Sequence, residues 1–342
     1  MDSSYTNFEK YGSLIAEIHG KVSSMLQQSD YESLEQCETV EDMVVRLSHT
    51  SYASYLSEEL QFNKKEFLKR LNKSFYNEFM YMYRNSENDL KLLLNYFIEV
   101  IKIQNFIFLL ASKSEDPDLK CMEEIDMLGN FNELDAIKIS ADMSDVYKFC
   151  VESTFLKKYY DKVYIEKEFA KNDWQIIQST FFKNHIENFY DQINNLDTMD
   201  YMKEILKYEG DRKIIELTIN TLDSVDIVDK KRIDLYPTVC SFDRGSICKM
   251  SECTSMESIR DVLCGHPMYK KIVMYEDNDF MKNLFDLEIK NYLSSLSEFN
   301  DLSCAYCYFK LKEREIKNIM WIAECISHEN KEGMKDVIVI EN

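Results

Sequence analysis

The chain has 342 residues, a mass of 40.7 kDa and 45% apolar residues. Seven glycines and three prolines make up about 3% of it, against about 12% in an average protein. Tight turns and hairpins need these two residue types, so the composition disfavours turn-rich β folds and predicts long helices. Glycine-rich nucleotide loops of the GxGxxG or GxxxxGKS/T kind are absent from the sequence.

The chain is strongly acidic, because 61 Asp and Glu residues outnumber 41 Lys and Arg residues and give a net charge of −20. Such a surface repels phosphate backbones and disfavours nucleic acid as the main ligand. It also disfavours docking on anionic lipid through a basic patch. The charge is consistent either with simple solubility or with a basic protein partner.

No transmembrane segment is expected. The most apolar stretch, residues 92–111, is interrupted by Asn95, Glu99, Lys102, Gln104 and Asn105, whereas a span needs about 20 mostly apolar residues. The N-terminal decapeptide lacks the basic and apolar regions of a signal peptide. We therefore expect a cytosolic protein whose ten cysteines stay reduced.

The predicted elements are long helices, with breaks near Ser112–Asp118 and Asp223–Pro237. Apolar residues recur at i, i+3, i+4 and i+7. The segments with this spacing cover about 63–84, 87–112, 166–195, 198–223, 278–297 and 301–329. They pair into three hairpins. The short segment Asp336–Ile340 is the only strand candidate.

A five-position apolar pattern with offsets 0, 3, 7, 12 and 16 occurs three times, before each predicted hairpin. The copies are Val40, Met43, Leu47, Tyr52, Leu56; Met143, Val146, Cys150, Phe155, Tyr159; and Met256, Ile259, Leu263, Met268, Ile272. Thr39, Asp142 and Ser255 precede them as good N-caps. The copies start 103 and 113 residues apart, too far for common solenoids. The pattern predicts three lobes, residues 1–116, 117–229 and 230–342.

Candidate catalytic and metal-binding residues are few. The five histidines lie outside known catalytic motifs, and His185 is predicted to be solvated or half-buried within a helix. Zinc sites usually combine two short-spaced cysteine pairs. Here one CxxC lies in a predicted helix and the other spacings are irregular, which favours buried thiols over a metal site. The residues weighed for metal binding are Cys240, Cys248, Cys253, Cys264, His266, Cys304 and Cys307.

The residues alone thus predict an acidic, all-α protein with a structural or coupling role and no cofactor. A helical adaptor or scaffold without enzymatic activity is the first alternative. An enzyme with an unfamiliar active site is the second. An enzyme would need a concave site with perturbed titrating groups.

Two sequence blocks resemble subunit d of the eukaryotic V-type proton ATPase. Gln28–Leu56 matches a pattern close to QxDYxxLxQCETxEDxxxxLxxTxYxxxL, and Leu311–Ile326 matches LKExExxNIxWIAECI. Weaker collinear similarity lies between them, at Leu128–Phe131, Tyr208–Asn220 and Phe285–Lys290. The resemblance therefore covers nearly the whole chain, with its most specific part at the two ends.

This resemblance implies an all-α, funnel-like socket made of three pseudo-symmetric lobes. It implies a non-catalytic subunit of the V0 sector on the cytoplasmic face of vacuolar or other endomembranes, attached through partners. Those partners would be the proteolipid c ring, the central-stalk subunits D and F, and the static subunit a. Stalk rotation, driven by ATP hydrolysis elsewhere, would be passed to the ring and would move protons.

The residues that match the family's motifs are candidates for partner contacts, for lobe packing or for helix capping. They are Gln36, Cys37, Glu38, Thr39, Glu41, Asp42, Tyr52, Asp211, Arg212, Glu313, Glu315, Asn318, Trp321 and Glu324. Thr39 is expected to cap a helix, and Trp321 is expected in the core. Polar members in the final helix are expected either to form a buried network or to line the socket.

Overall fold

A computed structural model describes residues 3–56, 64–115, 125–131, 134, 151–152, 154–160, 174–222, 230–273, 280–296, 301–330 and 332–336. All the regular elements in these ranges are helical, so the predicted all-α class is confirmed. The strand expected at Asp336–Ile340 lies outside the described residues except for Asp336, which ends the 3-10 helix Glu332–Asp336.

The chain divides into two compact units. Unit 1 comprises residues 1–94, 197–202 and 281–342, and unit 2 comprises 95–196 and 203–280. The main helices of unit 1 are α1 (Ser3–Val22), α2 (Gln28–Glu35), α3 (Val40–Leu47), α4 (Ala53–Leu56), α5 (Lys64–Arg84), α16 (Phe280–Leu296) and α17 (Ser303–Ser327). The division into three lobes and the funnel shape stay predictions.

Unit 2 holds most of α6 (Asn88–Glu115), which begins in unit 1. Its other helical elements are η2 (Met127–Gly129), η3 (Phe155–Tyr159), α10 (Trp174–Ile193), α11 (Asp200–Asn220), α12 (Lys230–Leu235), α13 (Arg244–Ser251), α14 (Met256–Cys264) and α15 (Lys270–Val273). The long helices lie where the apolar spacing predicts them, within a few residues at each described end.

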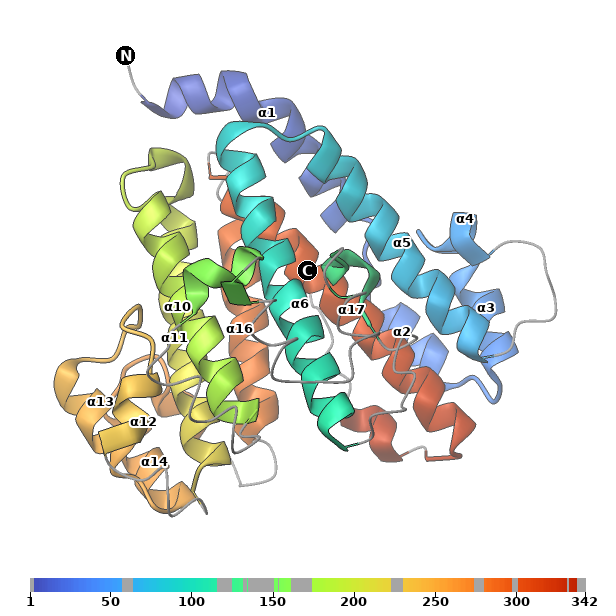
Figure 1. Ribbon diagram of the computed structural model, residues 1–342. Helices are drawn as coiled ribbons and strands as arrows, with labels where there is room; N and C mark the ends of the chain where they lie inside the picture. Colours follow the sequence, from blue (N-terminus) through green and yellow to red (C-terminus); the bar gives the residue numbers. More distant parts are fainter. Residues whose placement is uncertain are drawn as a thin grey trace. The chain divides into compact units, whose positions relative to one another are not determined.

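Helix α17 forms the centre of unit 1, where it packs against α1, α3 and α5 (Figure 1). Its residues from Ser303 to Phe309 are all buried. The rings of Phe79 and Phe309 lie 4.7 Å apart between α5 and α17. Cys304 and Cys307 are fully buried within this helix, as the sequence predicts for this CxxC. Cys264 differs from that expectation, because it is exposed on α14.

Helix α6 is more apolar than the sequence analysis allowed. Among the described helices it alone, over Asn88–Ser112, is long and apolar enough to cross a membrane by length and composition. However, 61% of its most apolar stretch is buried inside the protein. Phe106, for example, meets Phe181 of α10 edge-to-face at 6.1 Å. Internal packing therefore accounts for its composition.

The predicted N-caps are confirmed in both described copies of the repeated pattern. Thr39 accepts from the amide of Asp42 at 3.1 Å, and Asp42 accepts in return from the amide of Thr39 at 3.1 Å. Ser255 and Ser258 form the same capping box at the start of α14. The cap expected at Asp142 lies outside the described residues. Reciprocal capping satisfies amides that a helix start otherwise leaves without a partner.

One position of the third copy is wrong by one residue. Met268 is 40% exposed, whereas the neighbouring Tyr269 is 1% exposed. The physical reason is that α14 has nine residues and α3 has eight, so Tyr269 takes the place of Met268, whereas Ile272 is buried at its predicted position. All five positions of the first copy are buried, as predicted.

The capping box of α3 gives a stability prediction. Thr39→Ala removes the side-chain acceptor and should lower the free energy of unfolding by about 1 kcal/mol. The matched control is Ser29→Ala, which changes an exposed residue of α2. Urea unfolding measures both variants, and equal stability of the two would contradict this role for Thr39.

Candidate functional site: three carboxylate-centred clusters

The first cluster surrounds Glu315, which is fully buried on α17. Its carboxylate accepts from the hydroxyl of Tyr52 at 2.7 Å, from Lys312 Nζ at 2.6 Å and from the backbone amide of Leu26 at 2.6 Å. Lys312 also lies over the Tyr52 ring, 4.2 Å from its centroid. We call these four residues the Glu315 cluster. It joins the last long helix to the segment that carries α2, α3 and α4.

A cavity of about 410 Å³ lies beside this cluster within unit 1. Its lining includes the cluster members Tyr52 and Lys312, and also Tyr308 and Glu78. Tyr308 donates to Glu78 at 2.5 Å, and Lys21 Nζ donates to the same carboxylate oxygen at 2.9 Å. The charged groups that line the cavity are thus all paired, Lys21 with Glu78 and Lys312 with Glu315.

The second cluster surrounds Glu99 on α6 in unit 2. The carboxylate accepts from Lys158 Nζ at 2.9 Å and from the hydroxyl of Tyr159, and His185 Nε2 lies 3.6 Å away. We call these four residues the Glu99 cluster. Burial alone would raise the pKa of Glu99, but contacts from His185, Tyr159 and Lys158 lower it to about 2. The carboxylate therefore stays ionised.

His185 differs from the sequence prediction, because it is 1% exposed rather than solvated or half-buried. Its ring stacks on Tyr96 at 4.4 Å and meets Tyr159 edge-on at 5.0 Å. Burial lowers its pKa, and the neighbouring Glu99 opposes this effect. The imidazole is thus a packed aromatic between α6, α10 and η3.

The third cluster surrounds Asp211, which is fully buried on α11. It accepts from the amide of Ser241 at 2.7 Å, from the Ser241 hydroxyl, and from the hydroxyl of Tyr269 at 2.8 Å. We call these three residues the Asp211 cluster. Burial raises the pKa of Asp211, although the hydrogen bonds from Ser241 and Tyr269 lower it.

Gly210 allows the Asp211 cluster to form. A Cβ on this glycine would lie 1.8 Å from the carbonyl oxygen of Val239, so the chain around Val239 can approach α11 only where no side chain intervenes. That approach delivers the Ser241 amide to Asp211. Gly210 thus permits the close approach of the two segments, and Asp211 accepts the hydrogen bond that results from it.

Arg232 supports the same part of unit 2 from α12 and is fully buried. Its guanidinium donates to the carbonyls of Ser251 at 3.0 Å, Cys253 at 2.7 Å and Thr221 at 2.8 Å. These carbonyls follow α13 and α11, so one cation holds the ends of two helices.

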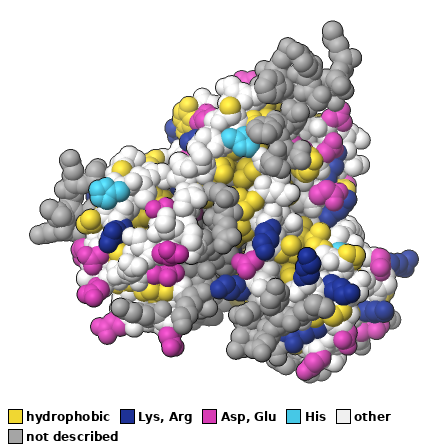
Figure 2. Space-filling view, turned by 180° about the vertical axis from the view of Figure 1, so that it is seen from behind, with side chains coloured by type: hydrophobic (Ala, Val, Ile, Leu, Met, Phe, Trp, Pro, Cys, Tyr) yellow, Lys and Arg dark blue, Asp and Glu magenta, His cyan; other side chains and the backbone are white. Residues whose placement is uncertain are grey.

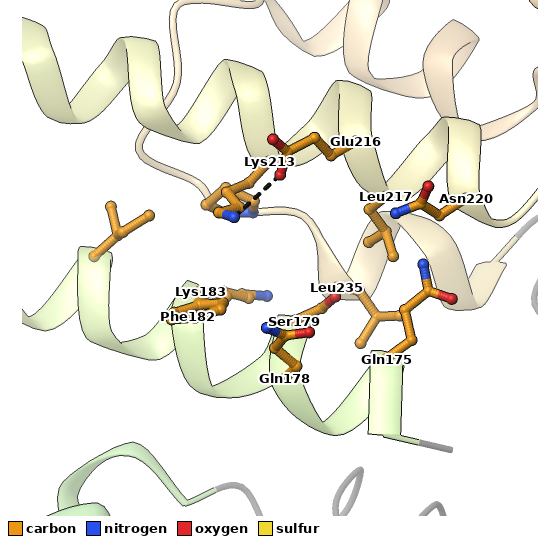
Figure 3. Close-up of a pocket in the computed structure, with 12 residues that line it drawn as sticks. Gln175, Gln178, Ser179, Phe182, Lys183, Lys213, Glu216, Leu217, Asn220 and Leu235 are labelled. Carbon is orange, nitrogen blue, oxygen red and sulfur yellow. Dashed lines mark hydrogen bonds and ion pairs between the residues drawn. The ribbon is translucent and has the colours of Figure 1, made fainter. Parts of the chain in front are cut away.

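A second, smaller cavity of about 160 Å³ lies between α10 and α11 (Figure 3). Its lining combines Lys183 and Lys213 with Glu216 and several carboxamide side chains. Lys213 Nζ donates to Glu216 at 3.0 Å, and Lys183 Nζ donates to the carbonyl of Asp234 at 2.6 Å. Within the described ranges, we find no group of three or more His, Cys, Asp or Glu residues arranged to hold a metal ion.

Apart from Trp321, the predicted site residues separate into three groups. Cys37, Thr39, Asp42, Tyr52, Asp211, Glu315 and Asn318 hold the fold through caps or buried contacts. Gln36, Glu38 and Glu41 are exposed, and the described structure shows no side-chain hydrogen bond or ion pair for them. Arg212 forms a partly buried ion pair with Glu216, and more exposed ion pairs join Glu313 with Lys317 and Glu324 with Lys64 and His328.

The prediction that Trp321 lies in the core is wrong. Its side chain is 45% exposed, and its indole N–H donates to the carbonyl of Gly333 at 2.8 Å. The buried face of α17 passes through Ile319 and Ile322 instead. The indole therefore ties the 3-10 helix that follows to the outer face of α17.

Sequence reasoning missed Glu99, Tyr159 as a donor, Tyr269 and Arg232. A charged residue inside an apolar helical face is the signal that could have identified Glu99, since Leu92–Ala111 is otherwise largely apolar. Arg232 gave no such signal, because its partners are backbone carbonyls.

The described structure therefore defines an all-helical protein whose buried polar clusters join short helical segments to long helices. On the face in Figure 2, acidic and basic side chains are interspersed with uncharged ones. Residues 14–337 match the family model described as "ATP synthase (C/AC39) subunit". The chain belongs to this family.

Similar proteins match over almost their full lengths. "Probable V-type proton ATPase subunit d 2" of Drosophila melanogaster is 26% identical over 341 residues, covering 97% of each chain. "V-type proton ATPase subunit d" of Dictyostelium discoideum is 25% identical over 336 residues, covering 96% of this chain and 94% of that one. The protein of the same name in Saccharomyces cerevisiae is 24% identical over 347 residues, covering 99% and 100%.

The buried guanidinium of Arg232 gives a second prediction. Arg232→Met leaves three carbonyls without this donor, at a cost of about 1–3 kcal/mol for each group left unsatisfied. We expect a loss of about 3 kcal/mol or more in the free energy of unfolding. Arg244→Met, at the exposed start of α13, is the matched control and should cost less than about 0.5 kcal/mol. Similar losses in the two variants would contradict the role of Arg232.

The Glu99 cluster gives a pH prediction. Because the pKa of folded Glu99 lies near 2, below the ordinary value of about 4.3, ionised Glu99 stabilises the fold above about pH 4.5. This contribution is lost as the pH falls toward 2. Urea unfolding at several pH values should show Glu99→Gln clearly less stable than the wild type at pH 7. The difference should shrink at low pH.

Glu257→Gln, exposed on α14, is the control for this measurement and should differ little from the wild type at any pH. A gap between the wild type and Glu99→Gln that stays constant from neutral to acidic pH would refute the assignment of an ionised, stabilising Glu99.

Proposed function

We propose that this chain is the d subunit of a V-type proton ATPase. In this role it is a non-catalytic V0 subunit on the cytoplasmic face of a vacuolar or other endomembrane. It caps the proteolipid c ring, receives the central-stalk subunits D and F, lies near subunit a, and passes stalk rotation to the ring. The observation that carries the proposal is the collinear match to proteins named as this subunit, over 94% or more of each chain.

The mechanical demand of this role suits the packing within each unit. A coupling subunit must resist deformation, and close-packed helical interiors have low compressibility. The hydrogen bonds of Glu315 join segments far apart in sequence, 289 residues in the case of Leu26, and those of Arg232 join neighbouring helices within unit 2. Such contacts oppose sliding of one element past another.

Affinity purification from detergent-solubilised membranes tests the assembly directly. The tagged chain should recover proteolipid c, subunit a and the D and F stalk subunits in one complex. Recovery of soluble proteins alone, from membranes in which an intact pump is demonstrable, would overturn the proposal and favour the adaptor alternative.

The exposed motif residues give a further prediction for this assembly. Glu38 and Glu41 match the family pattern and are exposed, with no side-chain hydrogen bond or ion pair in the described structure, although Glu41 also favours the N-terminus of α3 by its charge. We propose that they face a basic partner. Glu38→Lys combined with Glu41→Lys should reduce partner recovery at about 50 mM salt, with a smaller effect at about 500 mM because salt screens exposed charges.

Glu252→Lys combined with Glu257→Lys is the matched control, because it makes the same charge change at two exposed residues, one at the end of α13 and one in the first turn of α14. The prediction fails if both double variants recover partners equally, or if the loss is independent of salt.

A further inference from the structure

We propose that the chain contains three equivalent clasps, in each of which a buried tyrosine of a short helical segment donates to a carboxylate midway along a long helix. The clasps are Tyr52 with Glu315, Tyr159 with Glu99, and Tyr269 with Asp211. Each lies within one compact unit. The inference concerns the folded chain itself and stands apart from the proposed function.

The three carboxylates occupy matching places on their helices. Counted from the first helical residue, Glu99 is residue 12 of α6, Asp211 is residue 12 of α11 and Glu315 is residue 13 of α17. Each of these is the second helix of a predicted hairpin. The repeated pattern of the short segments is therefore matched by a repeated carboxylate position on the long helices against which they pack.

The short segments of the first and third clasps correspond residue by residue. A constant offset of 216 relates Cys37 to Cys253 and Thr39 to Ser255. Each of the two cysteines is buried and donates its thiol to the carbonyl four residues earlier, at 3.5 Å and 3.2 Å. The extra residue of α14 raises the offset to 217, which relates Tyr52 to Tyr269.

The same two segments are also held at their beginnings. The amide of Leu26 lies two residues before α2 and donates to Glu315, and the amide of Ser241 lies three residues before α13 and donates to Asp211. One carboxylate thus binds both ends of a two-helix segment.

The second clasp follows the scheme with a shift of one turn. The position that corresponds to Tyr52 is Phe155, which is half-buried, and the donor is Tyr159, four residues later. Lys158 supplies the second donor to Glu99. The α6 carboxylate is therefore bound by η3.

The order of the pairs is cyclic along the chain. Glu99 binds the segment that follows α6, and Asp211 binds the segment that follows α11. Helix α17 is the last long helix, and Glu315 binds the first segment, whose tyrosine is 263 residues earlier. Tyr52–Glu315 thus joins the two ends of the repeat series.

Burial, and after it the adjacent carboxylate, raise the pKa of all three tyrosines. Each hydroxyl therefore keeps its proton and donates. The pair Tyr308–Glu78 also links a tyrosine to a carboxylate, but both residues lie on long helices. It is an internal control for a tyrosine–carboxylate hydrogen bond outside the scheme.

Amide hydrogen exchange of the purified full-length chain tests the clasps. Glu315→Gln should raise exchange roughly 10- to 150-fold in residues 28–56, because a hydrogen bond to a charged group contributes about 1.5–3 kcal/mol. It should leave residues 244–273 unchanged. Asp211→Asn should do the reverse, and Glu99→Gln should act on residues 154–160.

Tyr52→Phe, Tyr159→Phe and Tyr269→Phe repeat the test with milder changes if a carboxylate variant does not fold. Tyr308→Phe should leave all three segments protected. The inference is overturned if Glu315→Gln acts equally on both segments, or if Tyr308→Phe releases residues 28–56. Because no partner is present, a failure here is distinct from a failure of the proposed assembly.

Discussion

A carboxylate buried on a long helix must be given hydrogen-bond donors, because its own helix supplies few and water is excluded. Glu315 and Asp211, which are fully buried, and Glu99, which is half-buried, each bind side chains or amides from a separate short segment. The hydrogen bonds of three carboxylates therefore determine which short segments pack on which long helices. Hydrophobic periodicity favours the helices, and the polar clusters determine which short segment packs against each long helix.

Local features of this fold followed from local sequence. The N-cap at Thr39 and the spacing of the long helices depend on residues a few positions apart, so pattern reasoning located them. The clusters depend on partners far apart, such as Tyr52 and Glu315, which no local pattern pairs. Four side chains were misplaced. One extra residue in α14 exchanged Met268 for Tyr269, and a hydrogen bond holds Trp321 on an outer face. His185 is buried by partners distant in sequence, and Cys264 is exposed.

The residues that match the family's motif pattern divide between two tasks. Tyr52, Thr39 and Glu315 stabilise the fold, because their side chains form hydrogen bonds within the chain. Glu38 and Glu41 lie outside the packing and carry negative charge. Closely packed helices with acidic groups exposed between them suit the proposed role of a subunit that passes force between partners.

ATP-driven proton uptake by membranes from cells that lack their own d subunit is the most direct test of this account. Expression of this chain should restore acidification that is abolished by removal of ATP, alongside a known d subunit as the positive control. If the chain is stably present in those membranes and the control restores uptake, but this chain does not, the proposed coupling role is contradicted.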